Sequence, residues 1–173
     1  MRQLACRGFP PLASKPTRPN MTFTFRENDL DSGDVRSLLD LHFASMRSIS
    51  PPEACHVLPA SGLREPGLTF WSMREDGRLL GVGALKELAP DHGEVKSMRT
   101  APDALGRGVG SAMLAHIVAE ARSRRYRRLS LETGSTEPFA AALHLYRREG
   151  FTPCGPFGGY QPTPFTRYFS RVL

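Results

Sequence analysis

The chain has 173 residues, of which 40% are hydrophobic and 23% charged, a composition typical of one globular domain with a sizeable core. No apolar run approaches the ~20 residues of a membrane span, so the sequence predicts no membrane-spanning segment. The net charge of +6 is concentrated in residues 1–20, and the rest of the chain holds 19 basic against 17 acidic residues, a balance too even to demand a nucleic-acid partner.

Residues 1–20 hold four prolines, no acidic residue and no periodic pattern, which predicts a disordered N-terminal tail. A single domain is then expected over residues 21–173. A transit peptide has a similar acid-free composition, but the prolines would break the amphipathic helix that a transit peptide needs. The favoured interpretation is an upstream or misassigned start of translation, with Met21 as the first residue of the folded domain. Three widely spaced cysteines without a CxxC pair favour a reducing cytoplasm over a disulfide framework or a zinc site.

The first half of the domain is predicted to begin with a strand at 21–28, where Phe and Thr alternate. A helix follows from Asp31 or Ser32 to about Ile49, because apolar residues recur at helical spacing and two prolines come directly after. Residues 53–66 are ambiguous between a loop and a short second helix.

An Asp-Gly pair at 76–77 separates two runs rich in β-forming residues, which predicts a β-hairpin. The remaining predicted elements are a strand at 92–101, a helix at 109–124, a strand at 127–134, a helix from Ser135 or Thr136 to Gly150, and two final strands around a Gly- and Pro-rich loop. The order β-α-(α)-β-β-β-α-β-α-β-β predicts a mixed α/β fold class.

Three glycines, Gly106, Gly108 and Gly110, alternate at the mouth of the predicted helix at 109–124. First-turn amides of a helix lack partners, and glycines let a phosphate approach them closely, so the stretch predicts an anion site. Arg107 adds a cation and Ser111 a hydroxyl. The alternative is a tight turn in which the glycines serve packing alone.

The spacing narrows the choice of phosphate ligand. A P-loop requires a Lys after its glycines, and none follows here. A dinucleotide-binding fold requires GxGxxG, but the third glycine of that pattern falls on Val109. Glu132 ends the next strand, where such a fold keeps its ribose-binding acid, so a dinucleotide-binding protein stays as an alternative.

Three linked segments, at 95–121, 128–135 and 142–151, resemble the GNAT superfamily of N-acetyltransferases. In the family's loop pattern, (Q/R)-x-x-G-x-(G/A), Gly108 and Gly110 match. The leading position holds Leu105 instead of Gln or Arg, but a loop that binds through backbone amides tolerates this departure.

The family's later signature, an aliphatic residue followed by Tyr-x-x-x-Gly-Phe, matches Leu145, Tyr146, Gly150 and Phe151. An Asn that often precedes that Tyr by seven residues is replaced by Phe139. The resemblance covers about residues 21–173 and is strongest over 94–151.

The resemblance implies a mixed, mostly antiparallel sheet, flanked by helices, with a V-shaped splay between its two central strands. It also implies acetyl-CoA as co-substrate, whose pantetheine arm pairs with the main chain at Met98, Arg99 and Thr100 as a pseudo-strand. The pyrophosphate is then expected on the loop residues Leu105, Gly106, Arg107, Gly108, Val109, Gly110 and Ser111.

The implied reaction moves an acetyl group directly to a primary amine of a small molecule or amino acid within a ternary complex. Glu94 matches the family's usual base, against the alternative of a solvated carboxylate at a strand end, and Glu132 on the facing strand is the second candidate, as a base or substrate residue. Tyr146 matches the family's acid near the CoA sulfur, against the alternative of a core aromatic. None of the five histidines has metal-ligand spacing, so no metal is expected.

The acceptor is the least readable part. Trp71, Phe157, Tyr160 and Arg167 are candidates to shape a pocket for a small carboxylate-bearing amine, and ordinary hairpin packing is the alternative. A non-catalytic CoA-binding sensor is a rival function, which Glu94 and Tyr146 disfavour. The sequence therefore predicts a cytoplasmic monomer or homodimer that binds a small amine and neither nucleic acid nor membrane.

Overall fold

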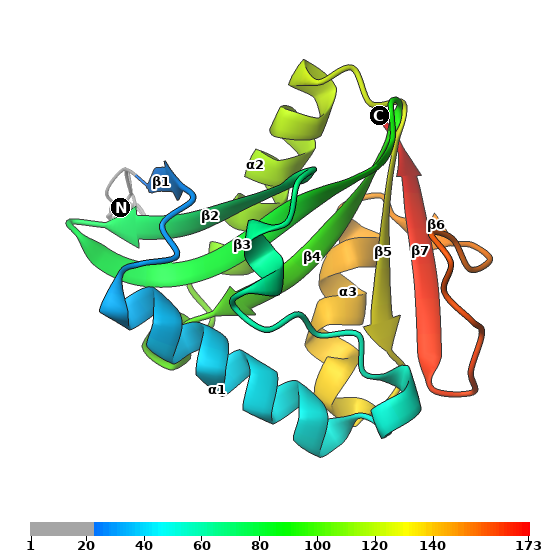
Figure 1. Cartoon of the computed structure of the whole chain (residues 1–173), viewed down its shortest axis with the longest axis horizontal. Coiled ribbons are helices and arrows are strands. Elements are labelled where there is room, and N and C mark those ends of the chain that lie inside the picture. Colours follow the sequence, from blue (N-terminus) through cyan, green and yellow to red (C-terminus); the bar gives the residue numbers. More distant parts are fainter. Residues whose placement is uncertain (1–22) are drawn as a thin grey trace, which may run out of the picture.

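The structure is a computed structural model that describes residues 23–173, so the expected tail at 1–20 lies outside the described residues. Seven strands form one sheet in the order β1-β2-β3-β4-β5-β7-β6 (Figure 1). The strands are β1 (Thr24–Glu27), β2 (Leu68–Glu75), β3 (Arg78–Ala89), β4 (His92–Thr100), β5 (Arg128–Gly134), β6 (Thr152–Pro153) and β7 (Thr166–Val172). The helices are α1 (Gly33–Ile49), α2 (Val109–Ser123) and α3 (Ala140–Arg148). No helix within residues 23–173 is long and apolar enough to cross a membrane.

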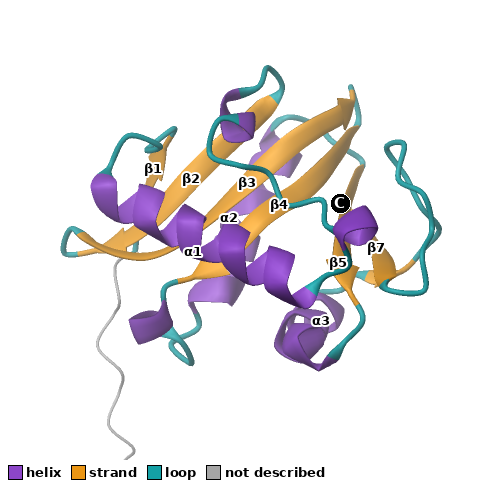
Figure 2. Ribbon diagram, turned by 60° about the horizontal axis from the view of Figure 1, so that its bottom comes forward, coloured by secondary structure: helices purple, strands orange, loops and turns teal. Residues whose placement is uncertain are grey.

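The helices cover both faces of the sheet. Figures 1 and 2 show α1 crossing one face while α2 lies behind the other. Small residues let α2 approach β3 closely, because a Cβ on Gly83 would meet the Met113 side chain at 2.9 Å. The first turn of α2 adjoins α3, since a Cβ on Gly110 would lie 3.3 Å from Leu145.

The two central strands form the predicted V. β4 and β5 are parallel and pair only where His92–Glu94 meet Arg128–Ser130. Beyond these residues they separate, while β4 stays paired to β3 and β5 to β7, both antiparallel. The expected mixed, mostly antiparallel sheet with a splay is confirmed.

A β-bulge interrupts β4 inside the open part of the V. Ser97 and Met98 together oppose the single residue Gly83, because Lys96 pairs with Ala84 and Arg99 with Val82. Ser97 has a left-handed φ of 51°. A bulge leaves an extra residue out of the ladder and re-aims the strand, so it turns main-chain groups of β4 toward the gap.

The local predictions hold with three adjustments. The Asp-Gly hairpin forms, and both turn residues are left-handed, with φ of 49° and 82°. Residues 53–66 hold two short 3-10 turns, Pro52–Ala54 and Gly62–Arg64, instead of a second α-helix. Pro138 lies in a further 3-10 turn, which delays the start of α3 to Ala140, and β6 is reduced to two residues.

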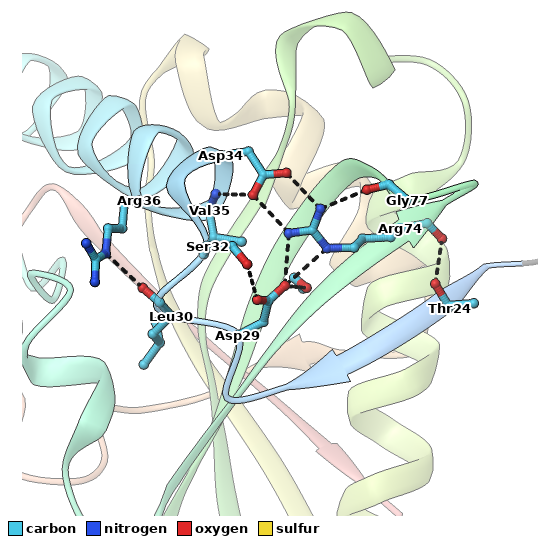
Figure 3. A network of polar contacts seen from close by, with 10 residues as sticks. Thr24, Asp29, Leu30, Ser32, Asp34, Val35, Arg36, Arg74 and Gly77 are labelled. Carbon is cyan, nitrogen blue, oxygen red and sulfur yellow. Dashed lines mark hydrogen bonds and ion pairs between the residues drawn. The ribbon is translucent and has the colours of Figure 1, made fainter.

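A buried arginine fixes the N-terminal end of α1 to the sheet (Figure 3). Arg74 of β2 is 4% exposed and donates hydrogen bonds to both Asp29 and Asp34. Ser72 donates to Asp29 at 2.6 Å, and the Arg74 guanidinium also donates to the Gly77 carbonyl at 2.9 Å. Every buried charge in this cluster is therefore paired, and the position of α1 over the V is held at its N-terminal end.

Candidate active site

The glycine loop ends in an open helix N-terminus. Gly106 and Gly108 have left-handed φ values of 72° and 81°, and a Cβ on either would meet nothing within 4 Å. Gly108 is the N-cap of α2, and the first helical bond runs from the Ala112 amide to its carbonyl at 3.0 Å. The amides of the first turn precede that bond, so they can serve an anion.

Two arginines lie near this loop and differ in their partners. Arg107 pairs with Glu75 at the end of β2, so its charge is already shared with a carboxylate. Arg148, from the last turn of α3, donates to the Ser111 hydroxyl in the first turn of α2 and also pairs with its neighbour Glu149 at 3.2 Å. Sequence spacing did not single out Arg148, because 37 residues separate it from Ser111.

Two cavities meet in the V. The first, of about 210 Å³, is bounded by α1, the 54–57 segment and both arms of the V. The second, of about 380 Å³, lies against α2 and α3 and reaches the glycine loop at Leu105 and Gly110. They share five lining residues, which are Met98, Arg99, Pro138, Ala142 and Tyr146. We call the first the α1 cavity and the second the loop cavity.

Glu132 of β5 lines the α1 cavity. Burial raises the pKa of its carboxyl to about 7, and the nearby Glu94 acts in the same direction, while Lys96 opposes them. A carboxyl with this pKa is present in both protonation states near neutral pH, which suits it to accept a proton.

Glu94 is placed differently. It is 2% exposed, and its Oε1 accepts hydrogen bonds from Lys96 Nζ at 3.1 Å and from the Tyr160 hydroxyl at 2.6 Å. Lys96 also donates to the Tyr160 oxygen at 2.6 Å, and this tyrosine comes from the loop between β6 and β7. The cluster ties that loop to the V, so Glu94 is already engaged with two donors.

Tyr146 of α3 lies at the junction of both cavities and is 9% exposed. Burial raises the pKa of its hydroxyl to about 12, with Glu132 adding to the shift, so the phenol keeps its proton at neutral pH. Its hydroxyl has no hydrogen-bond partner within residues 23–173 and is not sealed from solvent. It can therefore donate to a bound group.

Residues proposed for the acceptor from sequence fall in different places. Trp71 is 3% exposed, packs edge-on to His116 and lines neither cavity. Arg167 donates to main-chain carbonyls of its own loop, and Phe157 packs against Tyr160 and Tyr168. Tyr160 is the one of the four whose side chain is seen to contact residues of the α1 cavity, through hydrogen bonds to Glu94 and Lys96 and an edge-on contact with His56.

The structure instead brings His42 of α1 and Arg99 of β4 to the α1 cavity. Within residues 23–173, no group of three or more His, Cys, Asp or Glu residues is arranged to hold a metal ion.

Comparisons with known proteins agree with this geometry. The model of the acetyltransferase (GNAT) family matches residues 35–151. The uncharacterized N-acetyltransferase YedL of Escherichia coli K12 is 46% identical over 87% of this chain and 95% of its own. The corresponding values for YsnE of Bacillus subtilis are 47%, 84% and 97%. A solved Klebsiella pneumoniae protein of the acyl-CoA N-acyltransferase type superimposes with a TM-score of 0.71 and 26% identity over 89% of this chain and 99% of its own. The chain therefore belongs to the acetyltransferase (GNAT) family and is an enzyme of the acyltransferase class.

Proposed function

We propose that the protein transfers an acetyl group from acetyl-CoA directly to a primary amine of a small molecule. The observation that carries this proposal is the meeting of two cavities from opposite sides of the sheet at one tyrosine. A donor in the loop cavity and an acceptor in the α1 cavity would face each other at Tyr146, which is the arrangement that direct transfer needs.

The residues of the loop cavity fit CoA. The amides at the start of α2 and the guanidinium of Arg148 suit a pyrophosphate, and the left-handed Gly106 and Gly108 leave their surroundings open. Apolar walls from Met98, Val109 and Leu145 suit the thiol-bearing arm. Acetyl-CoA supplies an activated thioester, and every other function falls to the chain itself.

Glu132 takes the role of base in this proposal. An amine carries a proton at neutral pH and attacks only as the neutral form, so one proton passes to the Glu132 carboxylate and then to solvent. As the C–N bond forms and the C–S bond breaks, the second amine proton ends on sulfur. The phenol of Tyr146 donates a hydrogen bond to that sulfur, and a main-chain amide at the bulge polarises the thioester carbonyl.

The engaged carboxylate of Glu94 is assigned a different part. Its bonds to Lys96 and Tyr160 fix the wall of the α1 cavity, and its charge helps to keep the pKa of Glu132 high. We therefore reverse the order of the two carboxylates expected from sequence, with Glu132 first.

The test is a panel of primary amines offered with acetyl-CoA while free thiol is measured. The expected result is amine-dependent thiol release, together with calorimetric binding of CoA. CoA binding without thiol release for any amine would favour a CoA-binding sensor. Failure to bind CoA would overturn the assignment of the loop cavity.

A further inference from the structure

We propose that the acceptor amine also carries a carboxylate, and that Arg99 of β4, with His42 of α1 beside it, forms the subsite that holds this carboxylate. The inference deepens the proposed amine acetylation and rests on it. It concerns the α1 cavity, which Arg99 and His42 both line.

The charges of the α1 cavity are the first observation. Its charged lining residues are Glu94, Lys96, Arg99 and Glu132. Glu94 and Lys96 form an ion pair with each other, with side chains 3% and 10% exposed. Within residues 23–173, Arg99 and Glu132 have no such partner. The cavity thus offers one half-buried guanidinium and one carboxyl to a ligand, which is the charge pattern complementary to a zwitterion.

His42 is the second observation. It is 8% exposed in the middle of α1, and its Nδ1 is sealed from solvent without any hydrogen-bond partner. Burial, and secondarily the charge of Arg99, lower the pKa of the ring to about 4, so it is neutral at pH 7. With Nδ1 sealed, Nε2 is the ring nitrogen left to a ligand, and as an N–H it donates to an oxygen.

The placement of the two charges supports the same ligand. Counted from the last paired residues Glu94 and Ser130, Glu132 lies two positions further into the V and Arg99 five. This offset is counted only along the strands, because β4 and β5 separate beyond Glu94 and Ser130. Both residues nevertheless line the same cavity of about 210 Å³, so one small molecule in that cavity can place its amine at Glu132 and its carboxylate at Arg99.

Guanidinium is also the donor best matched to a carboxylate, because its planar fork binds both oxygens at once. A neutral or cationic amine would leave Arg99 half-buried and unpaired beside it. The cavity should therefore discriminate for acids over their uncharged analogues of equal size.

The experiment uses matched pairs of amines on the full-length protein. Glycine, β-alanine and 4-aminobutyrate are each compared with their carboxamides, which keep the size and remove the charge. We expect kcat/KM to favour the acid of at least one pair by roughly 10- to 100-fold, the value of a charged hydrogen bond. The carboxylate also raises the pKa of the amine in the same molecule, so at neutral pH less of the acid than of its carboxamide is present as the reactive neutral amine. This difference favours the carboxamide and therefore cannot produce the expected preference for the acid.

Variants then locate the preference. Arg99→Gln should reduce the acid-to-amide ratio to about 1, and Arg99→Lys, which keeps the charge without the fork, should leave an intermediate ratio. Arg47→Gln is the matched control, since it removes one exposed positive charge from α1 outside the α1 cavity and should leave the ratio unchanged.

Amides acetylated as well as acids, or an acid preference that survives in Arg99→Gln, would overturn the subsite and leave amine acetylation standing. A complete absence of acetylation would count against the proposed function, and the subsite is then decided by binding. In that case the N-acetylated acids are added to the CoA complex, and the pKa of His42 is measured by NMR from its ring signals. These signals are assigned by their loss in His42→Gln. A carboxylate bound at Arg99 cancels part of the positive charge that lowers the pKa of His42, so the pKa of His42 should rise. An unchanged pKa of His42 would overturn the inference. This measurement uses the wild-type protein, so it stands even if Arg99→Gln fails to fold.

Discussion

Glu132 is a carboxyl group whose surroundings oppose its own charge. Burial and Glu94 both raise its pKa, and Lys96, the cation that lowers it, is already paired with Glu94. This raised pKa has two measurable consequences. It sets the pH above which Glu132 can act as a base, and it sets the pH above which the charge of Glu132 destabilises the folded state.

The first consequence is in the rate. For wild type, kcat/KM should rise with pH through about 7 as Glu132 loses its proton. In Glu132→Gln this limb should disappear and the rate at pH 7 should fall by roughly 10²- to 10⁴-fold, with partial recovery at high pH where neutral amine is abundant. Glu94→Gln is the comparison. Its kcat/KM should still rise with pH, but the rise should occur at lower pH, because Glu94 raises the pKa of Glu132. If Glu94→Gln were instead the variant that lost the limb, the base would be Glu94.

The second consequence is in stability. The folded pKa of Glu132, about 7, lies above the ordinary value of 4.5, so its contribution is fully present below pH 4.5 and is lost as pH rises through 7. Glu132→Gln should therefore nearly match wild type at pH 4 and exceed it at pH 8.5, by at most about 3 kcal/mol. Urea unfolding at the two pH values measures this. Glu137→Gln, at an exposed site on the same chain segment, should show no such gain, and equal stability of Glu132→Gln and wild type at pH 8.5 would refute the raised pKa.

Tyr146 is tested by removing only its hydroxyl. Tyr146→Phe should keep the fold and the affinity for CoA, because the ring packs edge-on to Phe151 and the hydroxyl has no partner within residues 23–173. Turnover should fall by roughly 10²-fold, since a thiolate leaves tolerably without a donor. Tyr126→Phe, which loses a bond to Glu87 outside both cavities, is the control. Full turnover in Tyr146→Phe, with chemistry limiting the rate, would make this residue structural only.

At the scale of elements, the junction of the glycine loop and α2 is where we propose that a phosphate binds. Gly108 is the N-cap of α2 with a φ of 81°, and a side chain there would enter open space. Asn and Asp are the residues that best tolerate both left-handed backbone and the N-cap position, so they form a matched pair that differs in charge alone.

Gly108→Asp should weaken CoA binding much more than Gly108→Asn, by at least about tenfold, because a carboxylate then faces the pyrophosphate at the same helix end. Calorimetric titration with CoA at low salt measures both variants, and the difference should shrink as salt screens the charges. Equal affinities for the two variants would place the pyrophosphate away from this loop.

For the whole molecule, the sequence predicted what is encoded locally. The Asp-Gly hairpin, the helix after Ser32 and the glycine loop before α2 depend on residues within a few positions of one another, and they form as predicted, whereas the cap expected at Ser135 or Thr136 does not, because α3 begins at Ala140. The resemblance to the GNAT family supplied the splay, which no local pattern encodes.

Contacts between side chains that are far apart in the sequence could not be predicted from the sequence. Lys96 and Tyr160 are 64 residues apart, and His42 of α1 lies near enough to Arg99 of β4 for the arginine charge to lower the pKa of the histidine. Nothing in the spacing of a single chain states which distant side chains meet, so the pairing of Glu94 and the cation beside Ser111 required the structure. For Trp71, the sequence left open a pocket wall or ordinary hairpin packing, and its burial at 3% exposed in the core agrees with packing.

The arrangement of both cavities predicts the kinetic order of the reaction. The loop cavity and the α1 cavity share five lining residues in the V, so a donor in the first and an acceptor in the second, as proposed, could be bound at the same time. The rival is a covalent relay through a cysteine, and Cys55 is the only candidate within residues 23–173 that lines the α1 cavity.

Direct transfer predicts that double-reciprocal plots at several amine concentrations intersect. It also predicts that acetyl-CoA alone leaves no acetyl group on the protein, and that Cys55→Ala keeps its turnover within about twofold. Cys154→Ala, at an exposed position outside both cavities, is the control for general effects of removing a thiol. Parallel lines together with an acetylated Cys55 would replace direct transfer by a two-step relay, because only a covalent intermediate lets the first product leave before the amine arrives.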